Sequence, residues 1–142
     1  MKKIFMSLFT MLVVFSLVAC NQKETSDELI TDIGDSTRFT QDEISDAIKN
    51  VKDNFTFPAS TLTKICYNEE ESNKLTKSYL ENGRGQENGV KAENIIVLLT
   101  NFDVDDSGDN PVLNKGSIYE DYQWILIRDD KTSKWNIDDS GY

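Results

Sequence analysis

The chain has 142 residues, with 15 lysines and arginines, 25 aspartates and glutamates and no histidine. Its first twenty residues hold two lysines and no acid, so the other 122 carry 13 basic and 25 acidic side chains, a formal charge of −12. Such a surface repels a phosphate backbone, and we therefore expect no nucleic-acid partner. The lack of histidine removes the commonest general base and metal ligand, which excludes Ser-His-Asp and Cys-His catalysis.

The first twenty residues have the pattern of a secretory signal. Met1-Lys2-Lys3 is basic, residues 4–19 are nearly all apolar, and Leu17-Val18-Ala19 precedes Cys20. This apolar run of 16 residues is shorter than the roughly 20 residues of a membrane span. A signal peptide over residues 1–19 is therefore favoured, and an uncleaved N-terminal anchor helix is the alternative.

Leu17-Val18-Ala19-Cys20 resembles the lipobox of bacterial lipoproteins. The resemblance implies that Cys20 carries acyl chains such as palmitate and becomes the new N-terminus, which would hold the protein on the extracytoplasmic face of the cell membrane. With Cys20 lipidated, Cys66 has no partner within the chain, so an internal disulfide is excluded. We expect Cys66 to be a buried, unreactive thiol on a strand.

Behind the lipidated cysteine we predict a tether and one domain. Residues 20–38 are polar and mostly without period, which indicates a flexible, lipid-anchored tether with a reach of roughly 25 Å. Leu29, Ile30 and Ile33 leave open the alternative of a short segment docked on the domain. Residues 39–142 are long enough for a single domain of about 100 residues.

Residues 39–55 contain the clearest helix signal. Thr40 and Glu43 form a capping box, in which each side chain accepts a backbone N–H from the other residue. Apolar residues then recur at helical spacing, namely Ile44, Ala47, Ile48, Val51 and Phe55. Pro58 ends the segment.

A strand and a second helix are expected next. Residues 61–67 alternate and are rich in β-branched side chains, which predicts a strand. Asn68 and Glu71 form a second capping pattern, which predicts a helix to about Leu80. The glycines of residues 83–89 are interpreted as a helix-to-strand loop rather than a phosphate cradle, because no strand precedes them and no Lys-Ser/Thr pair follows.

Three further strands complete the prediction. Residues 93–104 are apolar on both faces around residues 95–99, which is typical of a central strand. Residues 119–128 and 134–138 form a hairpin around a loop at residues 129–133. The order predicts an α+β domain whose N-terminal helices pack on one face of a curved, mainly antiparallel sheet of about four strands.

A helix followed by a bent antiparallel sheet resembles the nuclear-transport-factor-like cone, also described as cystatin-like. Residues 122–128 and 134–142 look like its closing hairpin. Phe39-Thr40-Gln41-Asp42-Glu43-Ile44 and the Asp-Asp-Ser-Gly-Tyr ending are similar to small Firmicutes lipoproteins with one extracytoplasmic domain of unknown function. The resemblance covers residues 39–142 and implies a fold that hosts both enzymes and non-catalytic binding domains.

The acidic segment after the central strand is a candidate cation site. Its oxygen-bearing residues are Asp103, Asp105, Ser107 and Asp109. Asp103, Asp105 and Ser107, followed by Gly108, match positions one, three, five and six of a calcium loop. Position twelve is Asn114 instead of glutamate, which favours a solvated acidic loop. Weak calcium binding is the alternative and the one cofactor that the sequence suggests.

Aromatic side chains near the C-terminus are candidates for lining a ligand pocket. They are Tyr122, Trp124 and Trp135, and ordinary sheet core is the alternative interpretation. Three carboxylates, Asp121, Asp138 and Asp139, are candidates for acid–base work. In a chain with 25 acids such pairs also arise by chance.

Together these patterns predict a membrane-anchored, extracytoplasmic binding or interaction domain without catalysis of its own. We expect its partners to be the membrane, through the N-terminal lipid, and an envelope protein or a small ligand. The negative charge favours basic partners or cation-dependent contacts. A homodimer formed through the open sheet face is a further alternative. A histidine-free enzyme that uses Asp and Tyr side chains is the competing hypothesis, with a weak calcium-binding surface domain beside it.

Overall fold

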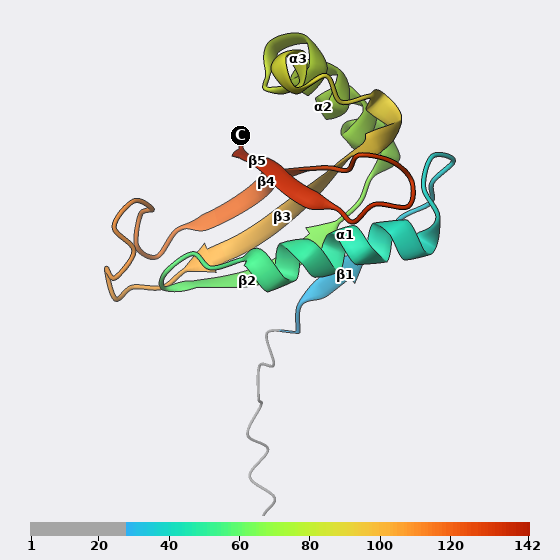
Figure 1. Ribbon diagram of the computed structural model, residues 1–142. Coiled ribbons are helices and arrows are strands. Elements are labelled where there is room, and N and C mark those ends of the chain that lie inside the picture. Colours follow the sequence, from blue (N-terminus) through green and yellow to red (C-terminus); the bar gives the residue numbers. More distant parts are fainter. Residues whose placement is uncertain (1–27) are drawn as a thin grey trace, which may run out of the picture.

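Helices cover both faces of one five-stranded sheet (Figure 1). The structure is a computed structural model that describes residues 28–142. The predicted signal peptide, Cys20 and the first part of the predicted tether lie outside the described residues.

The sheet has the strand order β1-β2-β3-β4-β5. In chain order the elements are β1 (Ile30–Asp32), α1 (Gln41–Asn54), β2 (Ser60–Cys66), α2 (Glu69–Asn82), the one-turn helix α3 (Gly85–Asn88), the 3-10 turn η1 (Ala92–Asn94), β3 (Ile95–Val104), β4 (Ile118–Ile127) and β5 (Asn136–Gly141). Neighbouring strands are antiparallel except β1 and β2, which are parallel. The predicted mixed α+β class and mainly antiparallel sheet are thus confirmed.

The first helix, α1, begins as its sequence predicts. The Thr40 hydroxyl accepts the Glu43 N–H at 3.2 Å, and the Glu43 carboxylate accepts the Thr40 N–H at 2.7 Å. This capping box satisfies two of the backbone donors that a helix start leaves free. The buried residues of α1 are Ile44, Ala47, Ile48 and Val51, so the predicted apolar stripe faces the sheet.

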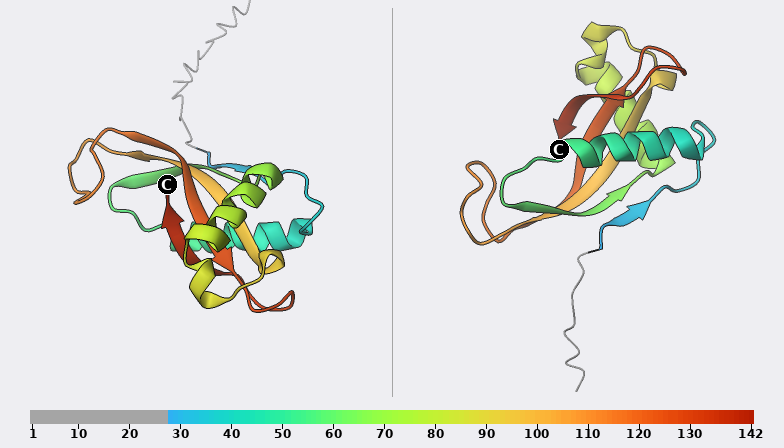
Figure 2. Two further views of the ribbon diagram at one scale, coloured as in Figure 1. Left: turned by 90° about the horizontal axis from the view of Figure 1, so that it is seen from above. Right: turned by 60° about the horizontal axis from the view of Figure 1, so that its bottom comes forward.

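The prediction that the helices share one face of the sheet is wrong. Ile96 and Leu98 of β3 belong to the core cluster under α1, whereas Ile95 and Val97 belong to a second cluster with Tyr79 of α2. Figure 2 shows α1 on one side of the sheet and α2 on the other. A strand that is apolar on both faces, as residues 95–99 are, requires a cover on both faces.

The sheet also has five strands instead of the predicted four. The added strand, β1, pairs with β2 and lies in the segment expected to be a tether, so the docked alternative describes Ile30–Asp32. Leu29 and Ile33 pack against the core. The turn behind them needs Gly34, because its φ is +63° and a Cβ there would lie 2.5 Å from the Tyr67 carbonyl oxygen.

The other departures concern segment ends. The last strand, β5, starts at Asn136, later than the predicted residue 134, and α3 occupies part of the predicted loop at residues 83–89. The connection between β3 and β4 and the connection between β4 and β5 lie at opposite ends of the sheet (Figures 1 and 2). The second connection, residues 128–135, lies beside the start of α1, and this end of the molecule holds the site described next.

Candidate functional site

Two of the predicted pocket residues are core residues. Trp124 is 4% exposed, and its indole N–H donates to the Thr100 hydroxyl at 3.0 Å. Tyr122 and Trp124 pack with Phe55, Phe57 and Phe102, with ring centres 4.9–6.4 Å apart. Neither residue lines either of the two hollows beside Arg128 that are described below. Trp135 does line one of them.

The acidic loop has local hydrogen bonds of its own. The Asp105 carboxylate accepts the Ser107 N–H and hydroxyl at 2.9 and 2.5 Å, and these two bonds lower the pKa of Asp105. The Ser107 hydroxyl accepts the Asp109 N–H at 3.1 Å, while Asp103 is an exposed residue of β3. Within residues 28–142 no three His, Cys, Asp or Glu side chains gather as a group that could hold a metal ion.

The predicted carboxylates fall in different surroundings. Asp121 and Asp139 are exposed, whereas the Asp138 side chain is only 13% exposed. The Tyr79 hydroxyl donates to the Asp138 carboxylate at 2.6 Å and accepts from the Asn88 side-chain amide at 2.7 Å. Arg84 donates to the Asp138 carbonyl at 2.8 Å and lies 3.5 Å from its carboxylate. We call this group, Tyr79, Arg84, Asn88 and Asp138, the Tyr79 cluster.

The Tyr79 cluster joins the α2–α3 region to β5. The pKa of Tyr79 is raised to about 12. Burial is the main cause, and the hydrogen bond to the Asp138 carboxylate is the second. A phenol that stays protonated to that pH is poorly matched to general-base work near neutral pH. The cluster therefore acts as a structural tie between a helix and the last strand.

Cys66 is more accessible than its sequence position suggested. It is the free cysteine of the described chain and is half-buried on β2. Burial is the main cause that raises the pKa of its thiol. Its protonated state at neutral pH agrees with the expected low reactivity.

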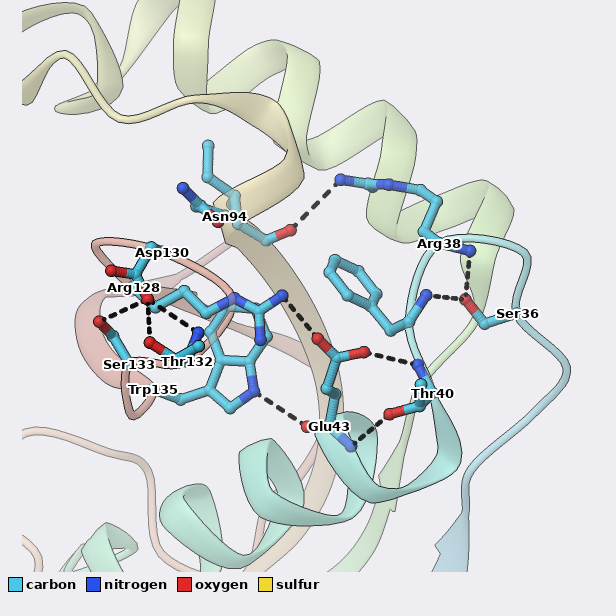
Figure 3. A network of polar contacts seen from close by, with 12 residues as sticks. Ser36, Arg38, Thr40, Glu43, Asn94, Arg128, Asp130, Thr132, Ser133 and Trp135 are labelled. Carbon is cyan, nitrogen blue, oxygen red and sulfur yellow. Dashed lines mark hydrogen bonds and ion pairs between the residues drawn. The ribbon is translucent and has the colours of Figure 1, made fainter.

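A buried arginine, Arg128, occupies the end of the sheet beside α1. It follows the last residue of β4, and its side chain is 3% exposed. One guanidinium nitrogen lies 2.7 Å from the Glu43 carboxylate, and the guanidinium carbon lies 4.3 Å from the centre of the Trp135 ring (Figure 3). The guanidinium carbon also lies 5.9 Å from the centre of the Phe39 ring, so this buried cation has a charged partner and two aromatic rings beside it.

Glu43 connects this arginine to the start of α1. One carboxylate oxygen caps Thr40 while the other faces Arg128. Burial by itself raises the pKa of Glu43, but the Thr40 N–H and the Arg128 guanidinium outweigh it, so the pKa lies below its ordinary value. The Trp135 indole donates to the Glu43 carbonyl at 2.9 Å, and the Asn50 side chain donates to the Trp135 carbonyl at 2.7 Å. These bonds hold residues 128–135 against α1.

Two buried polar atoms of this region have no hydrogen-bond partner within residues 28–142. They are Nε of Arg128, which is 4% exposed as a residue, and Oδ1 of Asn94, which is 8% exposed. The two residues are neighbours, since the backbone N–H of Arg128 donates to the backbone carbonyl of Asn94 at 3.0 Å. The Asn94 side-chain N–H donates to the Asp129 carbonyl at 3.0 Å, which fixes the orientation of its amide. Each unpaired atom costs about 1–3 kcal/mol.

Hollows lie on either side of Arg128. The first, of about 570 Å³, lies between η1 and the end of β4, and its lining includes Lys91, Asn94, Arg128 and Lys131. The second, of about 580 Å³, lies between α1 and the β4–β5 connection, and its lining includes Glu43, Arg128, Lys131 and Trp135. Both volumes fall in the range of small-ligand sites, roughly 300–1,000 Å³. We call Glu43, Asn94, Arg128 and Trp135 the Arg128 site.

Sequence reasoning found Trp135 and Glu43 but not Arg128 or Asn94. A signal for Arg128 was present, because Trp124, Leu126 and Arg128 alternate along one strand and side chains two apart share a face. A basic residue that continues a buried apolar face is a buried charge. Asn94 lies in a turn, and no periodicity predicts the burial of its side chain.

The domain that contains the Arg128 site matches a known family. Residues 37–141 match the family described as a domain of unknown function (DUF4829). The chain belongs to this family. Searches of curated proteins and of solved structures each found no match. The resemblance to the nuclear-transport-factor-like cone and to lipoproteins stays a prediction.

The matched DUF4829 region starts just after β1 and includes every residue of the Arg128 site. Over the part of the chain that the structure describes, every helix is too short or too polar to cross a bilayer.

Proposed function

We propose that this DUF4829 protein is a lipid-anchored domain on the extracytoplasmic face of a cell membrane, where it binds a ligand without catalysing its conversion. The observation that carries the binding function is a buried arginine that lines two hollows and whose Nε has no hydrogen-bond partner among residues 28–142. Buried polar groups in folded proteins are nearly always paired. An atom left unpaired beside a hollow therefore favours an external partner.

A structural role alone accounts poorly for the Arg128 site. A buried ion pair adds little net stability compared with apolar residues of the same size, and an unpaired donor subtracts from it. Connections at the end of a sheet are also where binding residues commonly lie. These three points favour recognition over scaffolding as the role of Arg128.

The titration of the strongest candidate groups supports binding without catalysis. The pKa of Glu43 lies below its ordinary value, and that of Tyr79 is about 12. One group is therefore ionised and the other protonated throughout the neutral range. General acid–base catalysis works best with a group whose pKa lies near the working pH.

The anchoring part of the proposal rests on the resemblance of Leu17-Val18-Ala19-Cys20 to a lipobox. Replacement of Cys20 by Ala should move the protein from the membrane fraction to the soluble extracytoplasmic fraction of cells. A Ser16→Ala variant, which leaves the cysteine in place, is the matched control. Unchanged membrane retention of the Cys20→Ala variant would establish an uncleaved anchor helix instead.

The binding part is tested by hydrogen–deuterium exchange on the protein extracted intact from cells. Exchange is measured with and without an envelope extract divided into fractions below and above about 3 kDa. We expect slower exchange in residues 92–96 and 128–136 with one of the two fractions, because ligand contacts protect backbone amides. Protection confined to the half of the sheet around Cys66 and Leu99, or no protection with either fraction, would contradict the assignment of the site.

A further inference from the structure

The two edges of the sheet are protected to different degrees. At the β5 edge, Arg84 donates to the Asp138 carbonyl at 2.8 Å, so a side chain of the domain already binds part of the backbone there. At the other edge, all three residues of β1 are exposed, and no strand within residues 28–142 pairs with its outer side. Figure 2 shows β1 at the rim of the sheet, beside α1. An open edge strand offers N–H and C=O groups to which another strand can pair.

The backbone of Thr31 points away from the sheet. The Asp32 carbonyl accepts the Tyr67 N–H at 2.9 Å, so the backbone groups of Asp32 face β2. The N–H and C=O of one strand residue point to the same side, and those of the next residue point to the opposite side. Both groups of the exposed Thr31 therefore face the free edge. Its side chain lies on the α1 face, because Thr31 pairs with Ile65 of the core cluster under α1.

A hollow of about 340 Å³ lies between β1 and α1, next to this edge. Thr31 and Ile33 line it on the β1 side, and Ile48, Lys49 and Lys52 line it on the α1 side. The second hollow of the Arg128 site lies along a different face of α1 and shares only Lys49 and Asp53 with this one. The hollow beside β1 is therefore a separate surface.

The lining of this hollow has more positive than negative charge, although the chain as a whole is acidic. Lys49 pairs with Asp53, whereas Lys52 has no ion-pair partner within the described part of the chain. Two lysines thus face one carboxylate. A second carboxylate placed in the hollow would be attracted by the unpaired Lys52.

We propose that β1 and α1 form a docking groove for an extended, acidic segment of a partner polypeptide, which adds to the sheet as a further strand antiparallel to β1. One residue of the segment lies opposite Thr31 and exchanges two backbone hydrogen bonds with it. Its side chain lies on the same face as that of Thr31, where a glutamate carboxylate pairs with Lys52. Main-chain bonds supply the affinity and the hollow supplies the specificity. This inference goes beyond the proposed function and does not rest on it.

The walls of the groove are held in place before any segment binds. Ile33 packs against the core cluster under α1. The Gln41 side chain donates to the Gly34 carbonyl at 3.1 Å, which ties the turn after β1 to the start of α1. Preorganised walls reduce the entropy that is lost on binding.

A five-residue peptide, acetyl-Val-Thr-Glu-Thr-Val-amide, is the probe of this proposal. Nuclear magnetic resonance of the protein extracted intact from cells reports on the backbone N–H of Thr31. We expect a saturable shift of this signal and slower exchange of its proton with solvent. N-methylation of the central glutamate removes one backbone hydrogen bond to Thr31 and should weaken binding about fivefold, the effect of about 1 kcal/mol. N-methylation of the next threonine, whose N–H points away from β1, is the matched control and should have little effect.

Three outcomes would overturn the proposal. Equal weakening by the two N-methyl groups, or no saturable shift of the Thr31 signal, would show that no strand adds to β1. Binding of a peptide with lysine in place of glutamate at equal or higher affinity would show that the groove does not select an acidic segment. A Thr31 signal that shifts with protein concentration in the absence of peptide, with a dimer in native mass spectrometry, would make a second copy of the chain the occupant.

Variants of the protein assign the effect to the two walls. Thr31→Pro removes the outward N–H, which does not pair with β2, and proline is tolerated at such edge positions. It should weaken the peptide about fivefold. Lys52→Ala should weaken it about twofold, as expected for an exposed ion pair, and serves if Thr31→Pro does not fold. Lys115→Ala, at an exposed lysine between β3 and β4, is the matched control for the change in charge. Equal affinity in wild type, Thr31→Pro and Lys52→Ala would contradict the proposal.

Discussion

The Arg128 site and the Tyr79 cluster each place a charged pair beside the sheet, but they differ in how completely their polar atoms are paired. In the Tyr79 cluster the hydroxyl both donates and accepts, and Arg84 reaches the Asp138 carboxylate and carbonyl. In the Arg128 site one donor and one neighbouring acceptor have no hydrogen-bond partner in the described part of the chain. Complete pairing indicates a structural tie, whereas incomplete pairing beside a hollow indicates recognition.

The comparison also separates residue type from role. Both groups contain an arginine, a carboxylate and an aromatic ring, so composition does not distinguish them. The arginines differ in exposure, since the Arg84 side chain is 64% exposed and that of Arg128 is 3% exposed. An exposed ion pair contributes little to the free energy of unfolding. Loss of one partner of a buried pair is strongly destabilising, because the other charge stays buried without compensation.

The largest expected effect comes from removal of Glu43. Glu43→Ala leaves the buried Arg128 guanidinium without its carboxylate and removes part of the α1 capping box. We expect the free energy of unfolding to fall by about 3 kcal/mol, measured by urea denaturation. Asp42→Ala, an exposed acid in the same helical turn, is the control and should change it by less than about 0.5 kcal/mol.

Replacement of the arginine itself should be milder. In Arg128→Met the apolar side chain suits the buried position, and Glu43, 24% exposed, keeps water and Thr40 as partners. The expected loss is under about 1 kcal/mol. If Arg128→Met destabilises the protein more than Glu43→Ala, Arg128 is a structural residue and its role in recognition loses its main support.

In the Tyr79 cluster, removal of one hydroxyl should have an intermediate effect. Tyr79→Phe removes the hydrogen bond to the Asp138 carboxylate and leaves the Asn88 amide without this acceptor. We expect a loss of about 1.5 kcal/mol, the value for a hydrogen bond to a charged group, by the same denaturation assay. Tyr142→Phe, at a residue that is 72% exposed, is the control. A Tyr79→Phe variant as stable as the wild type would show that the Tyr79 hydroxyl does not stabilise the contact between α2 and β5.

The two groups should respond to opposite ends of the pH scale. The pKa of Glu43 is lowered from 4.5, so its contribution is complete above pH 4.5 and is lost as the pH falls through the folded-state pKa. The pKa of Tyr79 is raised from 10.0 to about 12, so its contribution is complete below pH 10 and is lost as the pH rises toward about 12. Glu43→Gln should flatten the acid limb of a stability–pH profile, and Tyr79→Phe the alkaline limb. If the acid limb is unchanged in Glu43→Gln, the loss of stability at acid pH comes from other carboxylates.

Glu69 is a second carboxylate that we expect to contribute to the acid limb of the stability–pH profile. Its carboxylate accepts the Ser36 and Thr37 hydroxyls at 2.6 and 2.7 Å, and these bonds lower the pKa of Glu69 to about 2. Its contribution therefore declines between pH 4.5 and about 2. Glu69→Gln should flatten the limb over this whole range, which thermal unfolding at a series of pH values would show.

The smallest effect is expected far from both groups, in the acidic loop. Asp105→Asn keeps a side-chain oxygen for the Ser107 N–H, so the change in unfolding free energy should stay within about 0.5 kcal/mol. Calcium at millimolar concentration should shift the melting temperature of the wild type and the variant equally. A calcium-dependent rise in wild type alone would establish the loop as a cation site.

Most of the fold was predictable from local patterns. The capping box of Thr40 and Glu43, the Asn68 cap of α2 and the apolar β3 all follow from residue type and spacing. The placement of α2 on the opposite face from α1 depends on which face of the sheet remains uncovered, and this is a tertiary property. The strand β1 was missed because its three residues are exposed and carry no alternation long enough to detect.

The candidate site was predictable only in part. Trp135 was predicted to line a pocket or to join the sheet core, and it is 5% exposed beside Arg128. The pairing of Arg128 with Glu43 joins residues from β4 and α1 that are distant along the chain. Asn94 Oδ1 is left unpaired because the side-chain NH₂ group of Asn94 donates to the Asp129 carbonyl, which sets the orientation of the amide. Both features depend on residues that are close only in the folded structure, so no periodic pattern in the sequence predicts them.

The short strand β1 has a mechanical consequence. It is the first element that the structure describes, and it pairs with the sheet through β2 alone. If the chain is held at its N-terminus, as we propose, a pulling force acts first on Ile30–Asp32, before it reaches α1. Detachment of these three residues would lengthen the connection by roughly 10 Å while the Arg128 site stayed intact. The strand would then yield under tension before α1, whose first turn carries Glu43 of the Arg128 site.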